Sequence, residues 1–139
     1  MTTFVLDNSV AIRWCFDAGS NTYADSVLRQ LEAIDGQAFV PVLWRYEVAA
    51  VRARAQISGV LSGEDAADFV ADLQQQDIVV DTIGIDHVLG DVRQLATTYG
   101  LTGYDAAYLE LALRRNLPIA TLDKDLKRAC KAAGGTILL

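Results

Sequence analysis

Four acidic side chains stand out in this sequence because of their positions. Asp7 and Asp123 each come directly after a short apolar run, where a buried strand is expected to end. Glu47 and Asp105 each fall on the apolar stripe of a predicted helix. A carboxylate in apolar surroundings is costly unless it is paired or bound to a metal. These four residues are therefore the candidates for chemistry.

Each of the four has an ordinary explanation when it is taken alone. Asp is a preferred N-cap residue, so Asp7 and Asp123 are more simply interpreted as caps of the helices that follow them. Glu47 and Asp105 have no Lys or Arg three or four positions away on their helices, so a partner would have to come from another segment. Independent caps and ion pairs need not converge, whereas a metal site requires several carboxylates to lie together.

A set of this kind is suited to binding a hard cation. Four carboxylates with no His or Cys among them provide only oxygen ligands, which favours Mg²⁺ or Mn²⁺. These ions suit phosphodiester hydrolysis, because they lower the pKa of a bound water and stabilise the charge that develops on the phosphate. The sequence therefore favours a metal-dependent reaction over a cap-only explanation.

Alternating strands and helices must position these residues. Strands are predicted at 3–6, 38–40, 77–81, 118–122 and 136–139, and helices at 9–16, 22–35, 42–58, 61–76, 86–99, 103–115 and 123–134, with a break at 17–21. This order is typical of an α/β fold in which a mainly parallel sheet is covered on both faces. Ligands of such sheets bind outside the carboxyl ends of the strands, which is where Asp7 and Asp123 are expected. We find no linker or repeat and expect a single domain over 1–139.

Composition excludes several other classes of protein. The chain has 139 residues, of which 52% are hydrophobic, and a net charge of −6, which argues against gripping nucleic acid by bulk charge. Cys15 and Cys130 are too few and too far apart for a zinc site, and His87, the one histidine, is expected to be an ordinary helix residue. With neither a signal peptide nor an apolar run long enough for a membrane span, we expect a cytoplasmic protein that has no contact with membranes.

Charged residues are unevenly distributed along the chain. Eight acids and no Lys or Arg lie between residues 64 and 91, whereas six of the twelve basic residues lie between 114 and 131. Four of these share one face of the last predicted helix: Lys124, Lys127, Arg128 and Lys131. They are weak candidates for binding RNA phosphates, and a solvated helix face explains them equally well. Glu110 and Arg114 are expected to form an i,i+4 pair on a solvated face.

The same residues carry a family resemblance. The sequence is similar to that of PIN-domain proteins, and among them to the VapC toxins of bacterial toxin–antitoxin pairs. The similarity lies in four blocks: VLDNSV at 5–10, PVLWRYEV at 41–48, LTGYDAAYLELA at 101–112 and ATLDKDLKRAC at 120–130. It implies a three-layer α/β/α fold around a five-stranded parallel sheet, and Mg²⁺- or Mn²⁺-dependent cleavage of RNA.

The resemblance also implies roles for particular residues. The acidic residues of the family match Asp7, Glu47, Asp105 and Asp123. We expect Asp7, Asp105 and Asp123 to hold the metal, and Glu47 to bind it through water or to orient the attacking water. Ser9 and Thr121 match hydroxyls that could hydrogen-bond these carboxylates, although ordinary cap or strand-end hydroxyls would look the same.

Two positions fit the family pattern less well. Asn8 stands where many PIN-domain members have Thr or Ser, which we interpret as tolerated variation. Asp125 is a less certain fifth acid, since on a helix it lies about 200° from Asp123 and would not face the same ion.

Partners follow from the resemblance as well. They are an RNA substrate, a cognate VapB-type antitoxin and a second copy in a homodimer. Apolar side chains that include Trp14 and Trp44 could form a groove for a dimer or an antitoxin, although core packing explains each of them taken alone.

Two alternative functions stay open at this stage. A phospho-receiver domain would also be α/β with an acidic pocket, but it needs an acidic pair after the first strand, where this chain has only Asp7. A catalytically silent PIN scaffold that binds RNA or a protein partner would keep the fold without cutting.

Overall fold

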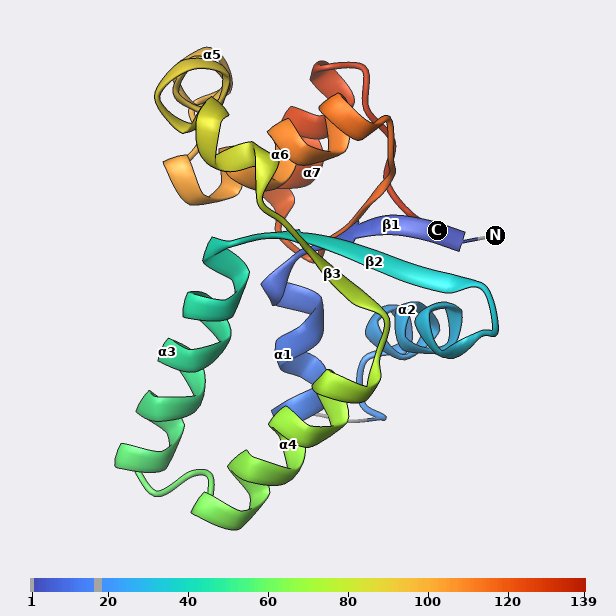
Figure 1. Ribbon diagram of the computed structural model, residues 1–139, viewed down its shortest axis with the longest axis vertical. Helices are drawn as coiled ribbons and strands as arrows, with labels where there is room; N and C mark the ends of the chain where they lie inside the picture. Colours follow the sequence, from blue (N-terminus) through green and yellow to red (C-terminus); the bar gives the residue numbers. More distant parts are fainter. Residues whose placement is uncertain (1, 17–18) are drawn as a thin grey trace.

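The computed structural model describes residues 2–16 and 19–139. Within these ranges the chain forms four strands and seven α-helices (Figure 1). The order is β1 (Thr2–Leu6), α1 (Asn8–Phe16), α2 (Thr22–Glu32), β2 (Gly36–Pro41), α3 (Leu43–Ile57), α4 (Gly63–Gln75), β3 (Ile78–Asp81), α5 (Arg93–Tyr99), α6 (Gly103–Arg115), β4 (Ile119–Ala120) and α7 (Lys124–Ala132). The predicted break at 17–21 falls in part on Asp17 and Ala18, which lie outside the described residues.

The sheet has the strand order β3-β2-β1-β4, and every neighbouring pair is parallel. The α/β class with a parallel sheet is thereby confirmed. In the register of the central strands, Val5 lies opposite Phe39 on one side and Ile119 on the other. Because β1 and β4 are neighbours, their carboxyl ends meet at one edge.

The predicted fifth strand at 136–139 is wrong. The segment makes a single isolated bridge, between Ile137 and Ile119. The Ile119 backbone bonds it on both sides, accepting from Leu138 N–H and donating to Thr136 C=O, each at 2.9 Å. Pro118 and Ala120 bond β1 instead, and the chain then leaves the sheet, so β4 offers the last segment only one residue to pair with.

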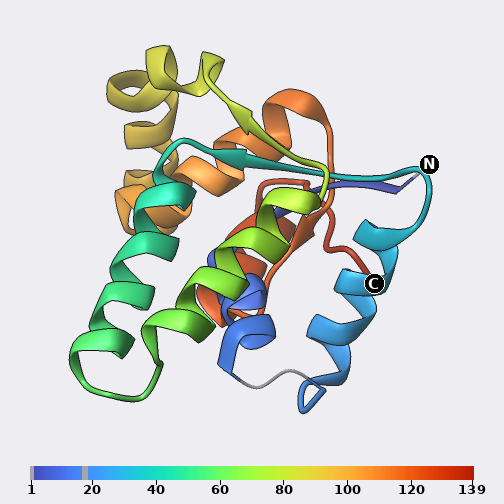
Figure 2. The same cartoon turned by 60° about the horizontal axis from the view of Figure 1, so that its bottom comes forward.

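Helices cover both faces of the sheet. Figure 1 shows α1 to α4 on one face and α5 to α7 on the other, and Figure 2 shows α3 and α4 as a hairpin that extends away from the sheet. The core lies between these layers, with Phe4, Leu6, Tyr108 and Leu109 fully buried. β3 is less well covered than its apolar sequence suggested, because it lies at the edge, and Val79 is 36% exposed.

Local sequence explains most helix boundaries. The side chains of Ser62 and Thr102 accept hydrogen bonds from the backbone N–H three residues later and cap α4 and α6. α5 ends at Gly100, which has a φ of 65° that favours glycine. The helix predicted at 86–99 is only partly helical: a 3-10 turn (Ile83–His87) and a π turn (Val88–Val92) precede α5, in a segment weakened by Gly84 and Gly90.

None of the helices among the described residues has the length and apolar character needed to span a membrane. Cys130 is buried and Cys15 is partly buried, and both are free thiols.

Candidate metal centre

The four acids lie near the N-terminal ends of four different helices. Asp7 joins β1 to α1, Asp123 is the N-cap of α7, Asp105 is in the first turn of α6, and Glu47 is the fifth residue of α3. Asp7 and Asp123 follow the neighbouring strands β1 and β4 and so lie at the same edge of the sheet. Helix N-termini carry partial positive charge, which favours carboxylates in these places.

Asp7 is held by two hydroxyl groups. The carboxyl is 5% exposed, and its Oδ2 accepts hydrogen bonds from Ser9 Oγ at 2.6 Å and Thr121 Oγ1 at 2.7 Å. Thr121 Oγ1 in turn accepts from the Asp123 N–H at 3.0 Å. Ser9 Oγ accepts from the Leu122 N–H at 2.9 Å, so its hydroxyl ties α1 to the loop after β4.

Glu47 and Asp105 are held by neutral groups on α6 or at its start. The Tyr108 hydroxyl donates to Glu47 Oε1 at 2.5 Å. Thr102 accepts from the Asp105 backbone N–H at 3.1 Å, which fixes the first turn of α6. The partner that the sequence left open for Glu47 is therefore a buried tyrosine and not a basic residue.

The pKa values of three of the carboxyls are raised. Burial raises the pKa of Asp7, and the charge of Asp123 adds to the effect against the two hydroxyl bonds. Burial, followed by the charges of Asp7 and Asp105, raises the pKa of Glu47, although the Tyr108 bond opposes it. The pKa of Asp105 rises to about 6 through burial and the charges of Asp123 and Asp7. The four acids are thus close enough to repel one another.

This arrangement suits a divalent cation. Among residues 2–16 and 19–139, none of the four acids forms an ion pair with Lys, Arg or His. Buried like charges without a counterion are unfavourable, and a cation would relieve their repulsion. The donor set consists of carboxylate oxygens with hydroxyls behind them, which matches Mg²⁺ or Mn²⁺.

The four acids are not the most closely spaced group of possible ligands in the described part of the chain. The trio whose possible ligand atoms all lie within 4.8 Å of one another is His87, Asp91 and Glu110, and it contains none of the four acids. The support for a cation at the four acids is therefore their charge and chemistry, and not a close spacing of their oxygens.

Comparison with known proteins shows the family of this chain. The family model for the PIN domain matches residues 4–132. The chain belongs to the PIN domain family. PIN domains are generally nucleases and usually use a divalent metal. No curated protein matches the sequence closely enough to count as a relative.

Two solved structures illustrate the shared fold. PAE2754 from Pyrobaculum aerophilum superposes with a TM-score of 0.69 at 22% identity, over 98% of this chain and 83% of that chain. FitAcB from Neisseria gonorrhoeae superposes with a TM-score of 0.62 at 20% identity, over 100% of this chain and 97% of that chain. At these identities the likeness shows the PIN fold alone.

The basic residues of α7 differ in how available they are. Arg128 pairs with Asp125 at 2.9 Å, and the Lys127 ammonium lies 5.7 Å from the centre of the Tyr23 ring. Lys124 and Lys131 are exposed and are the better placed of the four to meet a phosphate. Asp125, the uncertain fifth acid, is exposed and is engaged with Arg128.

The predicted i,i+4 pair of Glu110 and Arg114 is confirmed, but its predicted place on a solvated face is wrong. Glu110 is only 5% exposed, and its Oε1 accepts from Arg114 Nε at 2.6 Å. The same guanidinium donates to the buried Asp81 at 2.6 Å. Burial would raise the pKa of Asp81, but the hydrogen bond and charge of Arg114 outweigh it and lower the pKa. The pair is part of a buried ion-pair network between α6 and the end of β3.

His87 lies beside this network. Its Nδ1 is 2.9 Å from Asp91 Oδ2 and 3.9 Å from Glu110 Oε1. A cation bound by this trio would have to displace Arg114 from Glu110, so we assign it no metal. His87 was expected in an ordinary helix and instead ends the 3-10 turn before α5.

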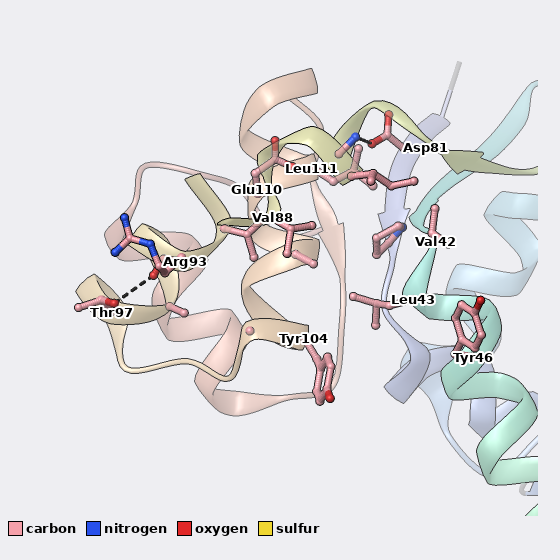
Figure 3. A pocket seen from close by; sticks show the side chains of 17 residues that line it. Val42, Leu43, Tyr46, Asp81, Val88, Arg93, Thr97, Tyr104, Glu110 and Leu111 are labelled. Atoms are coloured by element: carbon pink, nitrogen blue, oxygen red, sulfur yellow. Dashed lines mark hydrogen bonds between the residues drawn. The ribbon is translucent and has the colours of Figure 1, made fainter. Parts of the chain in front are cut away.

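An apolar cavity lies next to the acids but does not contain them. It has a volume of about 540 Å³ and lies between the start of α3 and α6, with the segment before α5 closing it (Figure 3). Its lining includes Tyr46 and Tyr104, which directly precede Glu47 and Asp105 in the chain. Because the tyrosines lie about 100° around their helices from the acids, the cavity and the acids lie on different faces of α3 and α6.

Two features of the site were not predicted from the sequence. Tyr108 lies three residues after Asp105, so its place on the same helix face was visible as a spacing, but its long-range partner was not. Asp81 ends an apolar strand as Asp7 does, and only the structure shows that Arg114 neutralises it.

Proposed function

We propose that this PIN domain is a Mg²⁺- or Mn²⁺-dependent endoribonuclease, and that it is the toxin of a VapBC-type toxin–antitoxin module. The observation that carries the proposal is the set of mutually repelling carboxyls with no basic partner among the described residues. Such a set has a strong affinity for cations and a reason to be retained despite its cost. The VapC-like sequence blocks support the choice of RNA as the substrate.

Asp7, Asp105 and Asp123 hold the metal in this proposal, directly or through water. When bound, the cation lowers the pKa of a water molecule and offsets the charge that develops on the scissile phosphate. The chain's own contribution is to hold three carboxylates from separate elements in fixed positions. Ser9 and Thr121 orient Asp7 by binding one of its two oxygens, Oδ2.

Glu47 has a different role, because one of its oxygens already accepts a hydrogen bond from Tyr108. The other oxygen, Oε2, accepts a hydrogen bond from the attacking water and aligns it. The raised pKa of Glu47 suits a group that takes a proton as the water attacks. The product of the proposed reaction is RNA hydrolysed at a phosphodiester bond.

RNA is held next to this site by weaker contacts. The α7 helix begins beside Asp123, and Lys124 and Lys131 extend from it into solvent. Lys127 and Arg128 add positive charge to the same helix. With a net charge of −6 on the chain, binding depends on this local strip.

Protein partners belong to the same proposal. A VapB-type antitoxin follows from the VapC-like sequence. The homodimer is supported by apolar side chains that line the 540 Å³ cavity and are exposed, such as Tyr46, Ile85 and Val88. RNA is a poor occupant for that cavity, because its lining is mostly apolar and includes the carboxylates of Asp81 and Glu110.

The Asp7→Asn variant tests the proposed function. We expect it to fold, as checked by circular dichroism, and to lose at least about 100-fold in Mn²⁺-dependent RNA cleavage and its growth inhibition on expression. Asp68→Asn, at an exposed acid on α4, is the matched control and should keep both.

Chelation of divalent ions should abolish wild-type cleavage, and added Mn²⁺ should restore it. Sequencing of RNA 5′ ends after brief expression of wild type and Asp7→Asn would then identify the target. A folded Asp7→Asn variant that stays toxic, or RNA binding without any cleavage by the wild type, would contradict the proposal; the second result would point to a silent PIN scaffold.

A further inference from the structure

Tyr108 links two of the acid-bearing helices. It lies on α6, three residues after Asp105, and its ring is fully buried in the core. Its hydroxyl reaches across to α3 and donates to Glu47 Oε1 at 2.5 Å. A single side chain thus connects the helix that carries Asp105 to the helix that carries Glu47.

This contact is better explained by positioning than by packing alone. A buried tyrosine hydroxyl needs a hydrogen-bond partner, whereas phenylalanine would fill the same volume without that requirement. Tyr108 finds its partner in a carboxylate that forms no ion pair with the basic residues that the structure describes. Burial and the charge of Glu47 raise the pKa of the phenol, so Tyr108 remains a donor.

We propose that Tyr108 is a positioning residue for the candidate metal centre. By holding Glu47 Oε1 it fixes the rotamer of Glu47 and directs Oε2 to the water. By joining α3 to α6 it also sets the separation of Glu47 from Asp105. The inference rests on the proposed nuclease function, since it assigns a role within that site.

A matched control lies one turn earlier on the same helix. Tyr104 is 68% exposed and lines the apolar cavity. Removing its hydroxyl changes the same helix by the same atom without touching Glu47. Tyr104→Phe therefore separates the effect of the Tyr108 hydrogen bond from the effect of any Tyr→Phe change on α6.

The experiment measures metal binding as well as cleavage. Mn²⁺ binding to the intact chain is titrated by calorimetry or electron paramagnetic resonance for wild type, Tyr108→Phe and Tyr104→Phe. Loss of a group that orients a metal ligand costs about 10- to 100-fold in affinity or activity, so we expect Tyr108→Phe to lose about 10-fold in Mn²⁺ affinity or kcat. Its KM for RNA should change less than about twofold, and Tyr104→Phe should match the wild type.

A double-mutant cycle with Glu47→Gln tests whether Tyr108 acts through Glu47. If it does, Tyr108→Phe adds little to the loss already caused by Glu47→Gln, whereas a merely structural role would give additive losses. Wild-type Mn²⁺ affinity and kcat in a folded Tyr108→Phe, or additive losses, would overturn this inference and leave the nuclease proposal standing. A wild-type chain that binds no Mn²⁺ and cuts no RNA would overturn both.

Discussion

Two regions of the PIN domain treat buried carboxylates in opposite ways, and both are on α6. Near the start of the helix, Asp105 faces other acids, and its pKa rises to about 6. Five residues later, Glu110 shares the Arg114 guanidinium with Asp81, and the pKa of Asp81 is lowered. One helix therefore carries a site whose acids have no basic partner within residues 2–16 and 19–139, and a site that Arg114 neutralises.

The difference shows how a structural acid is distinguished from a functional one. At the Arg114 network the protein supplies the cation, and the ion pairs tie β3 to α6. At the candidate metal centre the described residues supply neutral donors, namely the hydroxyls of Ser9, Thr121 and Tyr108 and the Leu126 N–H, and these orient the acids without neutralising them. Carboxylates that are held in place but not neutralised are preorganised for an external cation.

The largest expected effect comes from removing the internal cation. Arg114→Met leaves Asp81 and Glu110 buried without a partner, and breaking a buried pair in this way costs about 3–5 kcal/mol. We expect a loss of that size in the free energy of urea unfolding. Arg54→Met, at an exposed arginine on α3, should change the free energy of unfolding by less than about 0.5 kcal/mol. A loss below about 1 kcal/mol for Arg114→Met would show that the network is not effectively buried.

A smaller loss of stability is expected when the Thr121 hydroxyl that holds Asp7 is removed. Thr121 is fully buried, donates to Asp7 and accepts from the Asp123 N–H. Thr121→Val keeps the shape of the side chain but leaves the Asp123 N–H without its acceptor. We therefore expect a loss of about 2 kcal/mol in the free energy of unfolding, measured by heat or urea. Thr121→Ser keeps the hydroxyl and should recover most of the loss. Equal stability of the Val and Ser variants would mean that the hydroxyl only fills space.

The smallest effect should appear in the pH dependence of the metal-free protein. The folded pKa of Asp105 is raised from 3.8 to about 6, so its contribution to stability is complete below pH 3.8 and is lost as the pH rises through 6. Asp105 is half-exposed, and solvent screening limits the effect to about 1 kcal/mol. In the presence of a chelator, we expect wild type to be less stable at pH 7.5 than at pH 5.

The Asp105→Asn variant isolates that contribution, because it removes the charge at nearly constant shape. It should be more stable than wild type at pH 7.5 and should show a flatter pH dependence, whereas Asp68→Asn should retain the wild-type slope. Because burial and neighbouring charges also raise the pKa values of Asp7 and Glu47, some slope of the same sign will remain. Wild-type stability that rises from pH 5 to pH 7.5 would contradict the repulsion described above.

Local patterns were sufficient for much of the fold and for the outline of the site. Helix α6 spans Gly103–Arg115, as predicted, because its cap Thr102 and the left-handed Asn116 at its end are local signals. The strand-end positions of Asp7 and Asp123 were visible because short apolar runs precede them. These signals depend only on neighbouring residues, so one sequence suffices to find them.

What the sequence could not show depends on contacts between distant residues. Asp81 comes at the end of an apolar strand, as Asp7 does. Unlike Asp7, it is neutralised by a basic residue, Arg114, which is 33 residues away. Glu47 meets Tyr108 across 61 residues. The last segment was predicted as a strand from its apolar composition, but β4 is too short to pair with it beyond one bridge.

The hydrogen bond between Thr121 and Asp7 joins residues that are 114 positions apart. During synthesis Asp7 therefore leaves the ribosome long before Thr121 and Asp123, the residues that complete its surroundings. A truncated product that stops before Thr121 would have three of the four acids and would lack Asp123, so it would have no complete site. If the domain is a toxin, unfinished chains would be harmless to the cell that makes them, and the activity would appear only when translation of the domain is almost complete.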